Sequence, residues 1–226
     1  MKNIFKRIIG EISLNVLIVS ALFLLSVFVF AFLANIVLSG NEASFDEEAF
    51  RFFEAHSTKG LIDVMGVLTF FGSSRFFVPA YIILIGVLIF KHQRTEAINI
   101  AVIAITSTAL MFGLKELFHR QRPQLPLLNA LTNFSFPSGH ALSSFIFCSV
   151  LIYLTWKSKF GITWKWVLSI LLVIFSITIG ISRIVLRYHY ASDVIAGFCL
   201  GFAWVILSLW IERKLTSGNV ERQLDR

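Results

Sequence analysis

The sequence predicts an all-α, polytopic membrane protein with six transmembrane helices and an interfacial helical segment between the first two. Hydrophobic residues make up 57% of the 226 residues and charged residues only 15%. The mean hydropathy of +0.80 lies outside the range of soluble globular proteins. The apolar residues form runs long enough to cross a bilayer, and the charged residues gather between them. We expect residues 1–226 to form a single membrane-embedded domain.

The first span follows a short basic N-terminus. The uncharged run from Ile12 to Asn41 is too long for the core of a signal peptide, so we expect it to remain attached. Residues 42–63 then mix acidic and basic side chains with several phenylalanines, a pattern typical of an amphipathic segment at the membrane surface. A short helix and a break at Gly72 extend this interfacial segment to about residue 75.

Five further apolar runs predict the other spans: Phe76 to Phe90, Ala97 to Leu114, Ser138 to Trp156, Trp166 to Ser182, and Val194 to Ile211. Between the third and fourth spans, residues 124–136 are rich in turn formers and predict a loop. Residues 212–226 read as a charged tail without a packing pattern. Cys148 and Cys199 both lie inside apolar runs, which favours burial as small hydrophobic side chains over a disulfide.

The distribution of basic residues predicts the orientation. Six spans place both termini on one side, and that side holds 12 of the 20 lysines and arginines. Both termini are therefore expected in the cytoplasm, and the protein in the plasma membrane. The net charge is +7, and the basic residues are scattered over short loops. This distribution favours contact with anionic lipid and excludes a continuous basic surface for nucleic acid. Five basic residues nevertheless cluster on the outer side: Lys115, Arg120, Arg122, Arg183 and Arg187.

These outer segments contain the residues of an anion site. Arginine presents a planar fork of donors that matches phosphate oxygens, and lysine adds a compact charge. Ser138 and Gly139 come just before a span, where backbone N–H groups and the helix dipole favour an anion. Donors of this kind stabilise the charge that develops during phosphoryl transfer, so neither a metal nor another cofactor is expected.

Two histidines supply the expected chemistry at this site. His189 and Asp193 are four residues apart, so in a helix the carboxylate holds the imidazole in one tautomer. His189 is therefore the expected nucleophile toward phosphorus. His140 follows the phosphate-binding turn and suits the general acid that protonates the departing oxygen and later activates water.

The order and spacing of these residues resemble the three-part signature of the type 2 phosphatidic acid phosphatase superfamily. The matching pieces are Lys115 with Arg122-Pro123, Pro137-Ser138-Gly139-His140, and Ser182-Arg183 with His189 and Asp193, within residues 115–197. Each piece alone is weak, but their agreement in type, spacing and order is specific.

The resemblance implies an outward-facing, metal-independent lipid phosphatase that forms a phosphohistidine on His189. It implies that His140 is the acid, that Asp193 orients the nucleophile, and that five residues bind phosphate: Lys115, Arg122, Ser138, Gly139 and Arg183. Bacterial relatives act on undecaprenyl diphosphate, in cell-wall synthesis, and on phosphatidylglycerol phosphate. The expected partners are thus a lipid phosphate and the bilayer, and the sequence indicates no protein partner.

Two alternatives remain open at this stage. An anionic-lipid transporter or flippase would use the same basic cluster without hydrolysis, although its polar residues would be expected on both sides. Arg120, Arg187 and His119 are compatible with simple anchoring at the lipid headgroups. His56 and His92 match no motif and are expected at the surface. Some phenylalanines, near Phe76, Phe77 and Phe134, are candidates to line an opening for the lipid tail.

Overall fold

The computed structural model describes residues 14–40, 44–128 and 131–224, and within these ranges the regular structure is entirely helical. The helices are α2 (Leu14–Leu38), α3 (Ser44–His56), α4 (Lys59–Phe70), α5 (Ser74–Phe90), α6 (Arg94–Phe118), α7 (Gly139–Lys157), α8 (Ile162–Val185) and α9 (Ala191–Leu224). The expected ends of the first span, Ile12 and Asn41, lie outside the described residues. The prediction of an all-helical polytopic membrane protein is confirmed.

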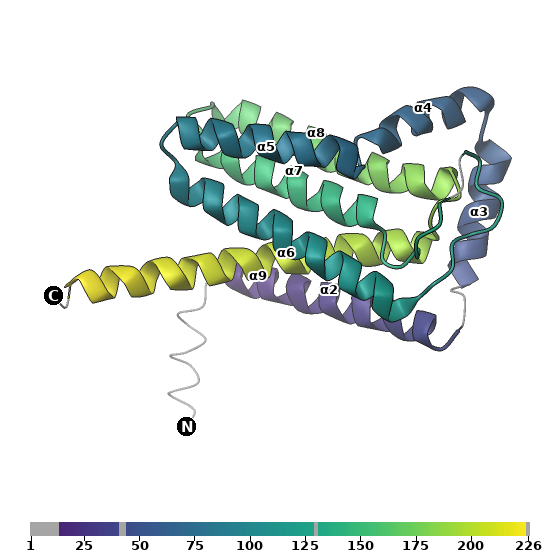
Figure 1. Cartoon of the computed structure of the whole chain (residues 1–226), viewed down its shortest axis with the longest axis horizontal. Coiled ribbons are helices and arrows are strands. Elements are labelled where there is room, and N and C mark those ends of the chain that lie inside the picture. Colours follow the sequence, from purple (N-terminus) through teal and green to yellow (C-terminus); the bar gives the residue numbers. More distant parts are fainter. Residues whose placement is uncertain (1–13, 41–43, 129–130, 225–226) are drawn as a thin grey trace.

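Among the described residues, five helices are long and apolar enough to cross a membrane: α2, α6, α7, α8 and α9 as far as Glu212. Helices α4 and α5 pass the same test together and are bent by 41° at the break between them, which gives up to six spans. Helix α3 lies across one end of the bundle, as expected for an interfacial helix (Figure 1). Helix α4, with its mainly apolar sequence, packs along α8 and leads into α5.

The last helix extends beyond the expected span and into the charged tail. Helix α9 does not end near Ile211 but continues to Leu224. No proline occurs between these positions, and Leu, Lys, Arg and Glu in this stretch are good helix formers, so the helix propagates beyond the apolar run. Cys148 and Cys199 are both free thiols, as predicted.

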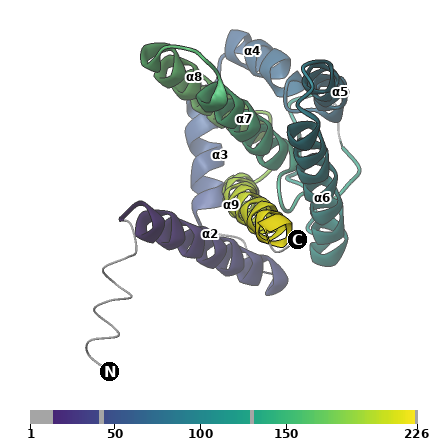
Figure 2. The same ribbon diagram turned by 90° about the vertical axis from the view of Figure 1, so that its left-hand side faces the viewer.

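Helix α7 occupies the centre of the bundle and packs against both α8 and α9, while α2 packs along α9 and α5 along α6 (Figure 2). Two glycines of α9 allow this close approach. A Cβ at Gly197 would lie 2.7 Å from the carbonyl oxygen of Ser138, and one at Gly201 would lie 3.2 Å from Phe145. The N-terminal ends of α7 and α9, which carry His140 and Asp193, are therefore held side by side.

Candidate active site

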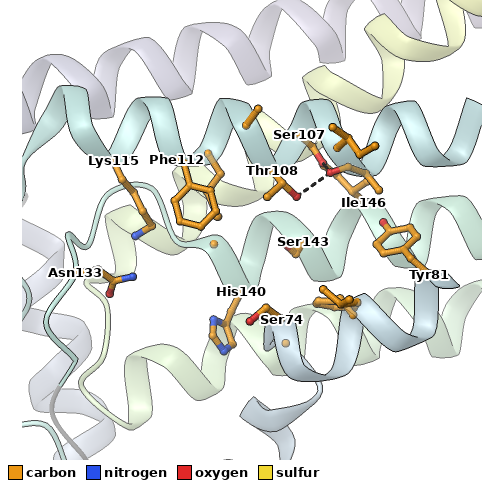
Figure 3. A pocket seen from close by; sticks show the side chains of 18 of the residues that line it. Ser74, Tyr81, Ser107, Thr108, Phe112, Lys115, Asn133, His140, Ser143 and Ile146 are labelled. Atoms are coloured by element: carbon orange, nitrogen blue, oxygen red, sulfur yellow. Dashed lines mark hydrogen bonds between the residues drawn. The ribbon is translucent and has the colours of Figure 1, made fainter.

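Six of the eight predicted site residues line a single cavity of about 720 Å³: Lys115, Arg122, Gly139, His140, Arg183 and His189. They come from α6, the following loop, α7, α8 and the turn before α9. Figure 3 shows Lys115, Asn133 and His140 toward one end of the cavity and Tyr81 toward the other. Ser138 and Asp193 do not line the cavity but lie fully buried behind it.

The tautomer of His189 follows from its two hydrogen-bond partners. Its Nδ1 lies 3.2 Å from Oδ2 of Asp193, and its Nε2 lies 3.2 Å from Nη1 of Arg122. A guanidinium can only donate, so Nε2 accepts with its lone pair and the hydrogen resides on Nδ1. The lone pair of Nε2 is therefore on the side of the ring that faces the cationic residues. Burial, reinforced by Arg122 and Arg183, holds the pKa of His189 well below its ordinary value, so the ring is neutral.

Two backbone hydrogen bonds define the turn that carries His189. Helix α8 ends at Val185, and the backbone N–H groups of Tyr188 and His189 both donate to the carbonyl of Arg183, over 2.9 and 3.1 Å. His189 is thus not helical, contrary to the simplest reading of its four-residue spacing from Asp193. The contact forms because this turn leads directly into the first turn of α9, where Asp193 lies.

Ser138 connects the second and third signature segments. Its backbone N–H donates to the carbonyl of Asp193 over 3.0 Å, and its Oγ accepts from the N–H of Ala141 over 3.5 Å. The N–H of Ser138 is consequently engaged within the protein and does not face the cavity as we expected. The first-turn N–H groups of Gly139 and His140 have no acceptor within the helix, and both residues line the cavity.

Three cations face the cavity and are held by defined partners. Arg183 is 2% exposed, donates through Nη1 to Oγ1 of Thr69 over 2.5 Å, and stacks on the ring of Tyr188. Its Nε is buried and has no hydrogen-bond partner among the described residues. Arg122 donates through Nη2 to Oδ1 of Asn133 over 2.7 Å, and Lys115 donates to the carbonyl of Phe134. The loop after α6 thus holds two of the cations.

The structure also gives contacts to residues to which the sequence analysis assigned no role. Thr69 and Gly72, on either side of the end of α4, touch Arg183 and His140, and Asn133 lines the cavity. Arg120, which we left between anchoring and function, is buried and pairs with Asp46 and Asp193.

The remaining candidates lie mostly outside the cavity. Arg187 pairs with Glu54 over 3.0 Å at the surface, and the side chain of His119 is 62% exposed. His56 and His92 are exposed, as expected. Phe77 lines the cavity, whereas Phe76 and Phe134 are not among its lining residues.

Comparison with known proteins places this chain among membrane phosphatases. The model of the PAP2 superfamily matches residues 96–217. Phosphatidylglycerophosphatase B of Bacillus subtilis is 31% identical over 157 residues, covering 69% of this chain and 77% of the relative. Undecaprenyl-diphosphatase of Sulfolobus acidocaldarius is 31% identical over 199 residues, covering 84% and 90%. The crystal structure of a transmembrane PAP2 type phosphatidylglycerolphosphate phosphatase from Bacillus subtilis superposes with a TM-score of 0.74 at 27% identity, covering 84% and 96%.

Proposed function

This chain belongs to the PAP2 superfamily and is a lipid phosphatase of the membrane; from that premise we propose that it dephosphorylates a lipid phosphate or diphosphate through a phosphohistidine on His189. The observation that carries this proposal is the tautomer of His189. With the hydrogen on Nδ1 bound to Asp193, the Nε2 lone pair is available on the side of the cations.

In the first step Nε2 of His189 attacks phosphorus, a P–N bond forms, and the P–O bond to the departing lipid group breaks. His140 donates a proton to the departing oxygen. Arg122 exchanges its hydrogen bonds to Nε2 of His189 and to the loop for hydrogen bonds to the phosphoryl oxygens. Lys115 and the unpartnered Nε of Arg183 donate to the same phosphoryl oxygens. Asp193 balances the positive charge that the ring of His189 acquires.

In the second step a water molecule attacks phosphorus of the phosphohistidine. His140, now neutral, accepts a proton from this water, the P–N bond breaks, and inorganic phosphate leaves. His189 returns to its neutral Nδ1–H form. Both proton transfers in this cycle use His140, and His189 supplies only the nucleophilic nitrogen.

The rest of the cavity suits a hydrocarbon tail. Beyond His140 its walls are apolar side chains of α5 and α6, such as Phe77, Ile82 and Ile105. Ile82 and Ile105 are 66% and 68% exposed, so the cavity opens sideways toward the position of the lipid. We propose two substrates: undecaprenyl diphosphate, converted to undecaprenyl phosphate, and phosphatidylglycerol phosphate, converted to phosphatidylglycerol. The names of the two relatives, undecaprenyl-diphosphatase and phosphatidylglycerophosphatase B, support this choice. The charged groups occupy only one end of the cavity, which does not favour a transporter.

Phosphate release from purified protein tests the function. A panel of undecaprenyl diphosphate, phosphatidylglycerol phosphate, phosphatidic acid and diacylglycerol diphosphate at matched detergent concentration should give at least one substrate, and EDTA should not abolish turnover. His189→Ala should remove activity, whereas His119→Ala, at an exposed position, should not. With a phosphorus-labelled substrate, wild-type protein should carry an acid-labile, base-stable label. Undiminished turnover by His189→Ala, or complete dependence on added divalent metal, would contradict the mechanism.

A further inference from the structure

A buried ion network connects α3 to the start of α9. Arg120 donates through Nη1 to Oδ1 of Asp193 over 2.6 Å and through Nη2 to Oδ2 of Asp46 over 3.1 Å. The side chain of Arg120 is 9% exposed and both carboxylates are completely buried. The guanidinium also lies 4.0 Å from the ring centroid of Tyr190. A long basic side chain that only anchors the protein at the headgroups would extend its charged end into water.

We propose that Arg120 and Asp46 are positioning residues that hold the Asp193 carboxylate in the orientation which sets the tautomer of His189, so that α3 is part of the catalytic unit. The inference rests on the proposed role of His189 as the nucleophile. Neither Arg120 nor Asp46 lines the cavity, so both act through Asp193.

The two oxygens of Asp193 divide these tasks. Oδ1 accepts a hydrogen bond from Arg120. Oδ2 accepts one from the backbone N–H of Tyr190 over 3.1 Å and lies 3.2 Å from Nδ1 of His189. Without the guanidinium on Oδ1, only the two contacts of Oδ2 restrain the terminal torsion of the carboxylate, which has broad minima. Arg120 therefore selects the rotamer in which Oδ2 accepts the hydrogen of His189.

Asp46 fixes the other side of the guanidinium and the start of α9. Its Oδ1 accepts the backbone N–H of Ser192 over 2.8 Å, and its Oδ2 accepts the hydroxyl of the same serine over 2.6 Å. The N–H of Ser192 is one of the first-turn donors that α9 cannot satisfy by itself. Asp46 thus holds Arg120 and the helix that carries Asp193 in one fixed arrangement.

The charges of the network also suit the chemistry. Two carboxylates and one guanidinium leave a net charge of −1 next to the ring of His189. The ring becomes positive when Nε2 binds phosphorus, and the network is then neutral. A buried group of charges stabilises a charge that develops in contact with it far more than exposed charges would. Loss of Arg120 would instead leave Asp46 and Asp193 as two buried negative charges without their shared cation.

Matched arginine variants test the inference. Arg120→Gln should lower kcat by roughly 10- to 100-fold, the range typical of partners that orient a reactive group, while KM changes by less than about threefold. Arg187→Gln, which removes the other arginine paired with α3, should keep wild-type kcat. Asp46→Asn should also lower kcat, and the double variant Arg120→Gln/Asp46→Asn should be no worse than Arg120→Gln, because both act through one network. Arg120→Lys, which keeps the charge, should recover part of the rate.

Nitrogen NMR of ¹⁵N-histidine-labelled protein gives a readout that does not depend on turnover. The wild type should show His189, assigned by loss of its signal in His189→Ala, as a neutral ring with the hydrogen on Nδ1. Arg120→Gln should shift this signal toward a mixture of tautomers. A wild-type kcat together with an unchanged His189 signal in Arg120→Gln would overturn the inference. If Arg120→Gln does not fold, kcat and the His189 signal of Arg120→Lys and Asp46→Asn test the inference instead. Failure of the wild type to release phosphate would refute the proposed function, whereas the NMR comparison would still test the network.

Discussion

The guanidinium of Arg183 in α8 donates to the hydroxyl of Thr69 in α4 over 2.5 Å, across 114 positions of sequence. Three residues later, Gly72 lies against both His140 and Ile179. The bent pair of helices α4 and α5 therefore touches the candidate active site twice, once at a cation that we propose to bind phosphate and once at the expected general acid.

Thr69→Val should weaken phosphate binding. Valine has nearly the shape of threonine but no acceptor, so Nη1 of buried Arg183 loses its partner and its fixed direction. We expect KM for the lipid and the inhibition constant of inorganic phosphate to rise about tenfold, or ~1.4 kcal/mol, with a smaller change in kcat. Thr178→Val, at a half-buried position of α8 that does not line the cavity, is the control. A wild-type inhibition constant in Thr69→Val would refute this role.

Gly72→Ala should displace the general acid. A Cβ at this position would lie 2.6 Å from Cγ2 of Ile179 and 2.7 Å from Cδ2 of His140, so one of these side chains has to move. A shift of about 1 Å in a catalytic group costs on the order of 100-fold in rate, and we expect kcat to fall by about this factor. Gly86→Ala, inside helix α5, should have wild-type kcat, because a Cβ there meets no atom within 4 Å. Equal kcat for the two variants would contradict the prediction.

Ala104→Phe should discriminate between lipid tails. Ala104 lines the apolar part of the cavity, so a phenyl ring there removes space needed by a long tail but leaves the cationic end intact. We expect KM to rise at least about fivefold, or ~1 kcal/mol, for a long-chain substrate and to stay unchanged for a short-chain soluble analogue. Ile98→Phe, at a position of α6 that is 62% exposed, should affect neither substrate. An equal rise in KM for both substrates would show that the lipid tail does not occupy this part of the cavity.

The pH dependence of kcat/KM should reflect the buried state of His189. Burial first, and then Arg122, Arg183 and Lys115, hold the pKa of His189 well below its ordinary value of about 6.5. The nucleophile is the neutral ring, which is populated above its pKa. Activity should therefore persist as the pH falls through about 6.5 and decline only at lower pH. A decline of kcat/KM on the acid side that is centred above about pH 6.5 would show that the pKa of His189 is not lowered in the free enzyme.

The proposed orientation can be tested by cysteine labelling. In a background in which Cys148 and Cys199 are replaced by alanine, a cysteine substituted for exposed Gln124 should react with an impermeant thiol reagent in intact cells. A cysteine substituted for exposed Lys159, in the loop between α7 and α8, should react only after the membrane is broken. The opposite labelling pattern would reverse the orientation derived from the basic residues.

Much of the fold and of the candidate site could be predicted from local sequence. Uncharged runs identify spans because each helix must satisfy its own backbone in lipid, a condition that depends on composition alone. Lys115, Arg122, Arg183 and the two histidines could be identified because their chemistry is carried by residue type and short spacing. The pairing of His189 with Asp193 is likewise local, since only a tight turn and the first turn of α9 separate them.

The supporting residues could not be predicted in this way. Asp46 lies 146 positions from Ser192, and its segment has the composition of a surface helix, so only the packing of α3 across the end of the bundle shows that its carboxylate is buried. Thr69 and Gly72 acquire their contacts from the bend between α4 and α5. Periodicity indicates which side of a helix is apolar but not which distant side chain it meets. The sequence by itself therefore determined the spans and the reactive groups, and the tertiary structure decided what holds those groups in place, because the supporting contacts join segments far apart in the chain.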